Sequence, residues 1–236
     1  MPEPKGKTFM RSPLKLSALL ALVLLAFSLV GGTGVGAQDD IEDEFQPSDL
    51  EGIQYGVARS WSMDFDAMFA MATPGADEDF SMSGILFMAG MVLEFDNDDN
   101  AKAGFDRISE EFSADSLMGT DDMTFEEWDV DAGEQSISYF STQEEEGVES
   151  EVVLSVVQDG SYVYIVSAAG SDVDMQDTAT TLMTTMIDND GSGEGEFNEN
   201  GTSTGGLWDK LPASDDEVVT GLIATDEVIY PESSEE

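Results

Sequence analysis

The sequence predicts an α+β domain in which an antiparallel sheet carries two helices packed on one face. Within residues 52–188, a group of strand-like runs is followed by a helical pattern, and this order then occurs a second time. The second group contains Asp159-Gly160, a two-residue turn signal typical of a β-hairpin. Hairpins build antiparallel sheets, and amphipathic helices must bury their apolar stripe on such a sheet, so the pattern predicts two layers.

The first group consists of two strands and a helix. Residues 55–63 alternate, with Arg59 and Trp61 on one face, which indicates a strand. Residues 84–95 are almost continuously apolar, which is typical of a buried strand. Acids and asparagines at 96–100 then precede apolar residues spaced by 4, 3 and 4 positions, which predicts a helix. Its apolar stripe consists of Ala101, Phe105, Ile108 and Phe112.

The second group consists of four strands and a helix. Short strands are predicted at 124–130 and 135–142, and the hairpin joins two β-branched and aromatic runs at 151–157 and 162–168. Ser171 followed by Asp174 resembles a capping box, so we expect a helix to begin there. Its apolar face consists of Met175, Ala179, Leu182, Met183 and Met186.

The first 37 residues have the features of an export signal. A basic start precedes an uncharged apolar run at 16–30, and the small residues Val35-Gly36-Ala37 suit cleavage after Ala37. We therefore expect residues 1–37 to be a signal peptide, and the cleaved protein to be secreted, extracellular and not inserted in a membrane. The alternative is a membrane anchor that is not cleaved, because residues 16–38 are uncharged over a length that can span a bilayer.

The flanks of the predicted domain differ from it in composition. Residues 38–51 are predicted to be an acidic, disordered lead-in, and residues 189–206 a flexible linker rich in Gly, Ser and Glu. In residues 207–236 apolar side chains return, and we expect this C-terminal segment to dock on the domain because Trp208 must be buried. Ser214 with Glu217 predicts a short helix over 215–223.

The composition removes most catalytic chemistry. The chain has no Cys and no His, which excludes disulfides, thiol nucleophiles, imidazole metal sites and Ser-His-Asp machinery. It has 51 Asp and Glu against 8 Lys and Arg, a formal net charge of −43. Phosphate backbones repel such a chain, so we expect no nucleic-acid partner.

This net charge also predicts the salt concentration to which the domain is adapted. On a folded chain of this size the acids lie about 13 Å apart on average. The Debye length is about 8–10 Å in ordinary buffer and about 3 Å at 1 M salt, so neighbouring carboxylates repel in the first and hardly at all in the second. Because the acids are spread along the chain, adaptation to high salt is favoured over a specific cationic partner, metal ions or a basic polymer, which is the alternative.

One stretch has the spacing of a calcium loop. Residues 188–199 resemble the EF-hand loop, which needs oxygen ligands at alternate positions, Gly at position 6 and Glu at position 12. Position 6 is Gly193, whereas position 8, normally a branched apolar residue, is Gly195. The candidate Ca²⁺ ligands are Asp188, Asp190, Ser192, Glu194, Glu196 and Glu199.

Three functions follow from these patterns. The first is an exported, highly acidic, non-enzymatic binding or accessory module with an unknown extracellular ligand. The second is a weak extracellular Ca²⁺-binding protein. The third is a hydrolase that uses two carboxylates, for which Glu126-Glu127 beside Trp128 is the candidate pair.

Overall fold

The computed structural model describes residues 47–64, 84–112, 124–145, 148–198, 202–213 and 216–231. The predicted signal peptide, residues 1–37, and the first part of the predicted lead-in lie outside these residues. The remainder of the lead-in is structured: Pro47–Asp49 forms a 3-10 helix, η1, and Leu50 is buried. The packed domain therefore begins before Gly52.

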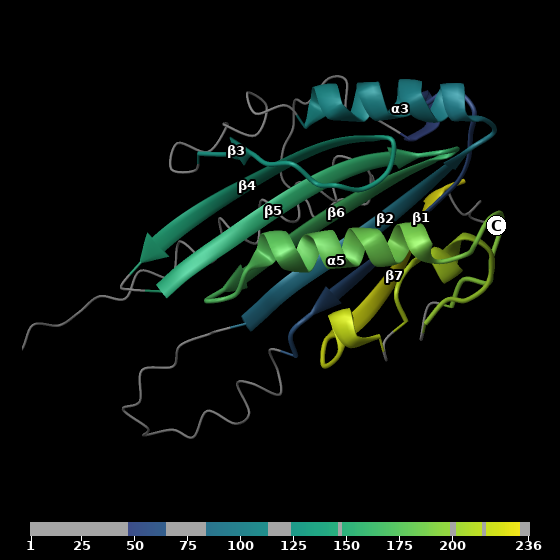
Figure 1. Ribbon diagram of the computed structural model, residues 1–236. Helices are drawn as coiled ribbons and strands as arrows, with labels where there is room; N and C mark the ends of the chain where they lie inside the picture. Colours follow the sequence, from purple (N-terminus) through teal and green to yellow (C-terminus); the bar gives the residue numbers. More distant parts are fainter. Residues whose placement is uncertain are drawn as a thin grey trace, which may run out of the picture.

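Within these described residues, seven strands form one antiparallel sheet in the order β3-β4-β5-β6-β2-β1-β7 (Figure 1). The strands are β1 (Ile53–Ser62), β2 (Gly84–Phe95), β3 (Glu126–Glu127), β4 (Gln135–Glu145), β5 (Val148–Asp159), β6 (Tyr162–Ser171) and β7 (Ile223–Tyr230). The hairpin turn between β5 and β6 is tight, because Asp159 and Tyr162 already pair across it and Gly160 has a φ of 54°. The α+β class with an antiparallel sheet is therefore confirmed.

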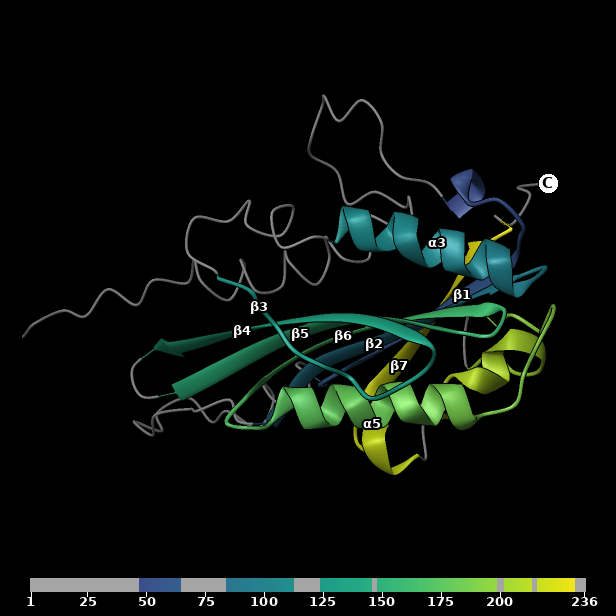
Figure 2. The same cartoon turned by 45° about the horizontal axis from the view of Figure 1, so that its top comes forward.

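The two helices in the described residues lie on opposite faces of this sheet (Figure 2). Helix α3 (Asp98–Glu111) packs with one core cluster, and helix α5 (Met175–Asp188) packs with another. Alternate residues of the same strand belong to different clusters: Val152 and Leu154 of β5 face α3, whereas Val153 faces α5. The prediction of two helices on one face was therefore wrong, and the domain has three layers.

The reason lies in the central strands. Strands β2, β5 and β6 contain long runs of consecutive buried residues, so both of their faces need a cover. Each face receives one helix. Gly90 in β2 leaves room for α5, because a Cβ there would lie 2.8 Å from the Met186 sulfur.

Both helices have side-chain caps at their first turn. Asn97 caps α3 by accepting a hydrogen bond from the Asn100 amide, 2.9 Å long. Asp174 caps α5 by accepting one from the Asp177 amide, also 2.9 Å long. The helix predicted to open at Ser171 therefore begins later, because Ser171 is the last residue of β6.

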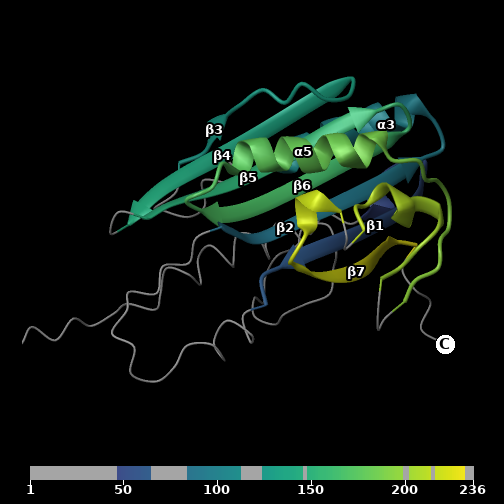
Figure 3. The ribbon, with the colours of Figure 1, turned by 60° about the horizontal axis from the view of Figure 1, so that its bottom comes forward.

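The C-terminal segment packs on the α5 side and then completes the sheet (Figure 3). It forms the 3-10 helices η2 (Gly206–Lys210) and η3 (Glu217–Val219) before β7 pairs with β1. The predicted helix over 215–223 is thus only one short turn, capped by Asp216, and it is followed by Gly221 with a φ of 87°. The turn cannot continue as a helix because a left-handed residue ends it.

The predicted linker is packed wherever the structure describes it. Glu196 and Thr204 exchange backbone hydrogen bonds of 2.8 and 3.1 Å, so the chain folds back on itself. Gly195 lies so close to the returning chain that a Cβ would approach the Gly205 carbonyl oxygen to 2.1 Å. Gly191, Gly195 and Gly206 therefore allow two backbone segments to pack closely.

Candidate functional site

Two buried cations hold the C-terminal segment on the sheet. The sequence after residue 37 contains four basic residues, Arg59, Lys102, Arg107 and Lys210. Arg59 and Lys210 are 2% and 6% exposed, although charged side chains are seldom buried without partners. Each lies in a cluster that joins the sheet to residues 189–231, so these clusters are the best-defined polar sites in the described part of the chain.

The Arg59 cluster consists of Arg59, Asp226 and the backbone around them. Strands β1 and β7 place Arg59 directly opposite Asp226, and the guanidinium donates from Nε at 2.5 Å and from Nη2 at 2.9 Å to the two carboxylate oxygens. It also donates to the backbone carbonyls of Ser203 at 2.8 Å and Pro212 at 3.0 Å. One side chain therefore joins β1 to the predicted linker at Ser203 and to two stretches of the C-terminal segment.

An aromatic ring lies against the same guanidinium. The Trp208 ring, 2% exposed, has its centroid 5.8 Å from the Arg59 Cζ atom. Phe197 in turn stacks with Trp208, with a centroid distance of 6.0 Å and an angle of 24° between the rings. A cation over an indole face is attractive, and more so where water is excluded.

The Lys210 cluster lies at the end of α5. The Lys210 ammonium donates a 2.8 Å hydrogen bond to the Asn189 carbonyl and lies 4.6 Å and 5.5 Å from the ring centroids of Tyr162 and Tyr164. Glu94 accepts a 2.6 Å hydrogen bond from the Gly193 amide nearby. The cluster thereby fixes residues 189–193 against strands β2 and β6.

Burial changes the acidity of these groups in opposite directions. Burial lowers the pKa of Lys210, and the charges of Asp190, Asp159 and Glu94 oppose this change. Burial raises the pKa of Tyr164 far above its ordinary value of 10.0, and burial followed by the charge of Glu94 raises the pKa of Tyr162. The folded state thus holds both phenols neutral at a pH where the unfolded chain ionises them.

These directions predict a loss of stability in alkali. A phenol with a raised folded pKa contributes stability that is fully present below pH 10 and is lost as the pH rises above it. Lys210 has the opposite effect on stability, because its lowered pKa favours the folded state as the pH rises. The large pKa shift, however, is that of Tyr164. We expect Tyr164→Phe to reduce the fall in the free energy of unfolding between pH 9 and 11.5.

Urea unfolding at constant ionic strength measures this fall. The free energy of unfolding of Tyr164→Phe at pH 7 is the control, since at that pH it differs from wild type only through the change in packing. An unaltered alkaline slope in Tyr164→Phe, with a normal value at pH 7, contradicts the prediction.

The structure describes five of the six predicted calcium ligands and spreads them along the chain from the end of α5. Asp188 ends α5, and Asp190, Ser192 and Glu194 follow it, whereas Glu196 lies in the backbone pair with Thr204. Glu199 lies outside the described residues. Among the described side chains, no group of three or more His, Cys, Asp or Glu could hold a metal ion. Calcium binding by this loop therefore stays a prediction.

The loop spacing predicts a measurable effect of Ca²⁺. At ten times its dissociation constant, Ca²⁺ that binds only the folded state adds about 1.4 kcal/mol to the free energy of unfolding. Scanning calorimetry at fixed high ionic strength should then show a higher Tm in Ca²⁺ than in Mg²⁺, and Asp188→Ala with Glu199→Ala should abolish the difference. Equal melting in Ca²⁺, Mg²⁺ and NaCl contradicts calcium binding.

The predicted hydrolase pair does not converge. Glu126 and Glu127 form the two-residue strand β3 and are both exposed. Successive side chains of a strand point to opposite faces of its sheet, so the two carboxylates cannot flank one bond of a substrate.

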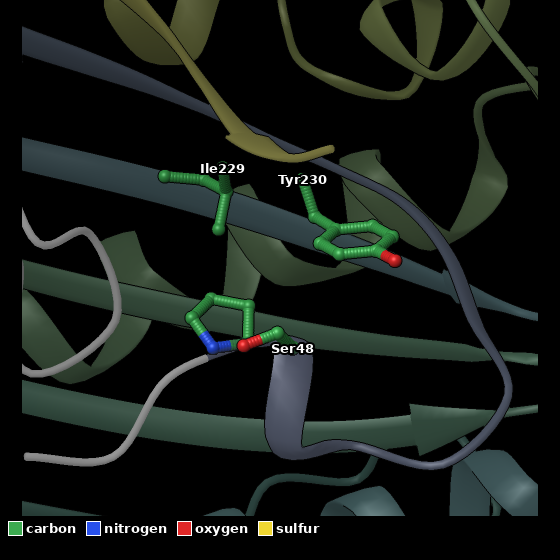
Figure 4. A pocket seen from close by; sticks show the side chains of 4 residues that line it. Ser48, Ile229 and Tyr230 are labelled. Carbon is green, nitrogen blue, oxygen red and sulfur yellow. The ribbon is translucent and has the colours of Figure 1, made fainter. Parts of the chain in front are cut away.

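A pocket of about 220 Å³ lies where η1 meets the end of β7 (Figure 4). Ile229 and Tyr230 line it from β7, and Pro47 and Ser48 line it from η1. None of the four is a carboxylate or a base, so the pocket offers two hydroxyls and apolar contacts rather than an acid-base pair.

Among the described residues, none of the helices has the length and apolar character needed to cross a membrane.

The sequence pattern alone did not indicate these two clusters. The one sign of the Arg59 cluster in the sequence was the position of Arg59 itself, which shares a face of the strand with Val57 and Trp61, and this face was expected to be buried. A lone cation on such a face requires a buried partner, but that partner lies 167 residues later.

Comparison with known proteins does not place the chain in a family. No protein-family model matches the chain, and no curated protein matches it. Among solved structures it is similar to the extracellular domain of PknH from Mycobacterium tuberculosis, with 19% sequence identity and a TM-score of 0.28. The likeness covers 40% of this chain and 52% of that chain, so it spans about half of the PknH domain. A likeness of this size establishes neither a common fold nor a common function.

Proposed function

We propose that this chain is an exported, non-enzymatic binding or accessory module adapted to high salt. The observation that carries the proposal is the placement of the cations. Arg59 and Lys210 are buried, and Lys102 and Arg107 lie on α3, where they pair with acids. The exposed cations of the described surface are therefore confined to α3, which itself carries more acids than bases, and such a surface suits a solvent that screens like charges.

The pairs on α3 are typical of an exposed surface. Lys102 lies 3.1 Å from Glu134, whose hydrogen bond and charge raise the pKa of the lysine, and Arg107 lies 2.8 Å from Glu111. Such exposed pairs contribute little to stability and are weakened by salt. The buried Arg59 cluster is hardly screened, so salt acts mainly on the repulsion between surface acids.

The proposal predicts that the domain gains stability with salt. Between about 0.1 and 1 M NaCl the Debye length falls from about 10 Å to about 3 Å, below the average spacing of the acids. We expect the Tm to rise by about 5–10 °C over this range, corresponding to about 2–3 kcal/mol. Thermal unfolding followed by circular dichroism measures this rise.

Salts also strengthen apolar burial, and a control must separate that effect from screening. Sucrose at matched osmolality strengthens burial without screening, so it should raise the Tm much less than NaCl. Screening also predicts that most of the gain occurs below 1 M. A Tm that is insensitive to NaCl, or that rises equally in sucrose, contradicts the proposed adaptation.

The non-enzymatic part of the proposal is supported by chemistry. Without His or Cys, catalysis would have to use carboxylates, hydroxyls or a bound hard cation. The candidate pair Glu126 and Glu127 points to opposite faces, and the pocket beside Tyr230 is lined without a carboxylate. No described feature favours the calcium or the hydrolase alternative over a binding role.

A further inference from the structure

Two buried serines on neighbouring strands lack the hydrogen bonds that burial normally requires. Ser138 of β4 is 2% exposed and Ser155 of β5 is 1% exposed, and neither hydroxyl has a hydrogen-bond partner among the described residues. Buried hydroxyls are nearly always hydrogen-bonded, because an unpaired one loses its bonds to water and gains none in return. The two hydroxyls therefore need a partner that the described chain does not supply.

The two serines face each other on the α5 side of the sheet. Ser138 lies directly opposite Ser155 in the pairing of β4 with β5. Ser155 alternates with Val153 and Val157, which pack with α5, so its side chain points to the same face of the sheet as theirs. Facing residues of an antiparallel pair have Cβ atoms about 4.5–5.5 Å apart, so one small molecule can reach both hydroxyls. Because serine is smaller than valine, two facing serines also fill less of this layer than the valines beside them.

A third buried polar group lies in the same row. The Trp128 backbone amide donates a 3.1 Å hydrogen bond to the Ser138 carbonyl, so Trp128 lies beside Ser138 on the β3 side. Its side chain packs with the α5-side cluster, and the indole Nε1 is buried without a partner among the described residues. Three unpartnered polar groups thus belong to three adjacent segments of the sheet.

Other serines of the sheet find partners where one is within reach. Ser150 and Ser171 also face each other across two strands, and their hydroxyl oxygens lie 2.9 Å apart in a direct hydrogen bond. Ser136, on β4, donates from its hydroxyl to the Val130 carbonyl at 3.1 Å. The serine pair under α5 makes neither kind of bond with any described residue, although both of its hydroxyls are buried.

We propose that one buried water molecule binds between Ser138 and Ser155 and accepts a hydrogen bond from the Trp128 indole. An indole N–H only donates, a hydroxyl both donates and accepts, and water has two donors and two acceptors, so one water satisfies all three groups. Three hydrogen bonds are typical of an internal water. An ion fits less well. No described group of acids could hold a metal here, and the two buried cations that an anion would need, Arg59 and Lys210, are held in their own clusters.

A crystal structure of the full chain, at a resolution that shows ordered water, tests the site directly. We expect a water within hydrogen-bond distance of both serine hydroxyls and of the Trp128 Nε1 atom. In solution at high NaCl, the indole proton of Trp128 should show a nuclear Overhauser effect to a bound water. A map without water at this position, or a direct bond between the two hydroxyls, overturns the inference.

Substitution of one serine gives a second test, because the sign of the change differs with and without water. If a water is bound, Ser155→Ala removes one of its partners and should lower the Tm by about 2–4 °C. If the hydroxyl is unpaired, the same substitution removes a buried polar group that has no partner, and it should raise the Tm. A rise in the Tm of Ser155→Ala is therefore incompatible with the bound water.

Two further variants serve as controls. Ser150→Ala breaks the direct hydroxyl pair with Ser171, so it shows the fall in Tm that the loss of one such bond causes in this sheet. Ser138→Ala combined with Ser155→Ala should lower the Tm by less than the sum of the two single changes, because both hydroxyls hold the same water. Fully additive changes in Tm would show that the two serines do not share a ligand, and would overturn the inference.

Discussion

We expect Arg59→Met to lower the free energy of unfolding by about 3–5 kcal/mol. Methionine fills much of the volume but leaves the buried Asp226 carboxylate without its cation, and it leaves the carbonyls of Ser203 and Pro212 without a donor. An uncompensated buried charge is among the costliest single defects in a protein. Urea unfolding in 2 M NaCl measures the loss.

Two further variants show whether the loss comes from burial. Arg107→Met removes an exposed guanidinium paired with Glu111 and should cost less than about 1 kcal/mol. Arg59→Met with Asp226→Leu should regain part of the stability, because the unpaired charge is gone while the carbonyls still lack donors. A loss below about 1 kcal/mol in Arg59→Met would contradict the buried pair.

Trp208→Ala should cost about 3–5 kcal/mol, the range for removing a large buried aromatic side chain. The indole is 2% exposed, has the Arg59 guanidinium over its ring and stacks with the Phe197 ring. Its loss leaves a cavity beneath the C-terminal segment and removes the cover of the charged pair. Urea unfolding and amide exchange of β7, which should become faster, both measure the effect.

The outer member of the stack provides the matched control. Phe197 is 43% exposed, so Phe197→Ala should cost no more than about 1.5 kcal/mol, the range for an aromatic pair. A double-mutant cycle between Arg59→Met and Trp208→Ala should be non-additive, since the two side chains are in contact. Additive losses, or equal losses for Trp208→Ala and Phe197→Ala, would show that the indole does not cover the pair.

Local patterns predicted the elements well where the signal lies within the element. The strand predicted at 84–95 coincides with β2, and the five residues expected on the apolar face of α5 are all buried. The start of α5 was misplaced because Ser171 and Asp174 are both good caps, and only the pairing of Ser171 with Gly84 shows that the strand extends further. Choosing between two caps requires the tertiary contact.

The layering was missed although its signal was present. Continuous apolar runs in β5 and β6 are typical of strands covered on both sides, but hairpins favoured the familiar arrangement of helices on one side. The candidate site was missed for a different reason. Arg59 and Asp226 meet only because β7 returns to β1, and no local pattern contains that pairing.

The distance in sequence between Arg59 and Asp226 also sets an order of events during folding. β1 is among the first strands to be synthesised and β7 is the last, so their 167-residue loop closes only after the other strands of the sheet have been made. Until then the Arg59 guanidinium has no counter-charge, on the very face that α5 is covering. Docking of the C-terminal segment is therefore the expected late, slow step, and a chain cut short before Asp226 would leave Arg59 on the sheet without the carboxylate that neutralises it.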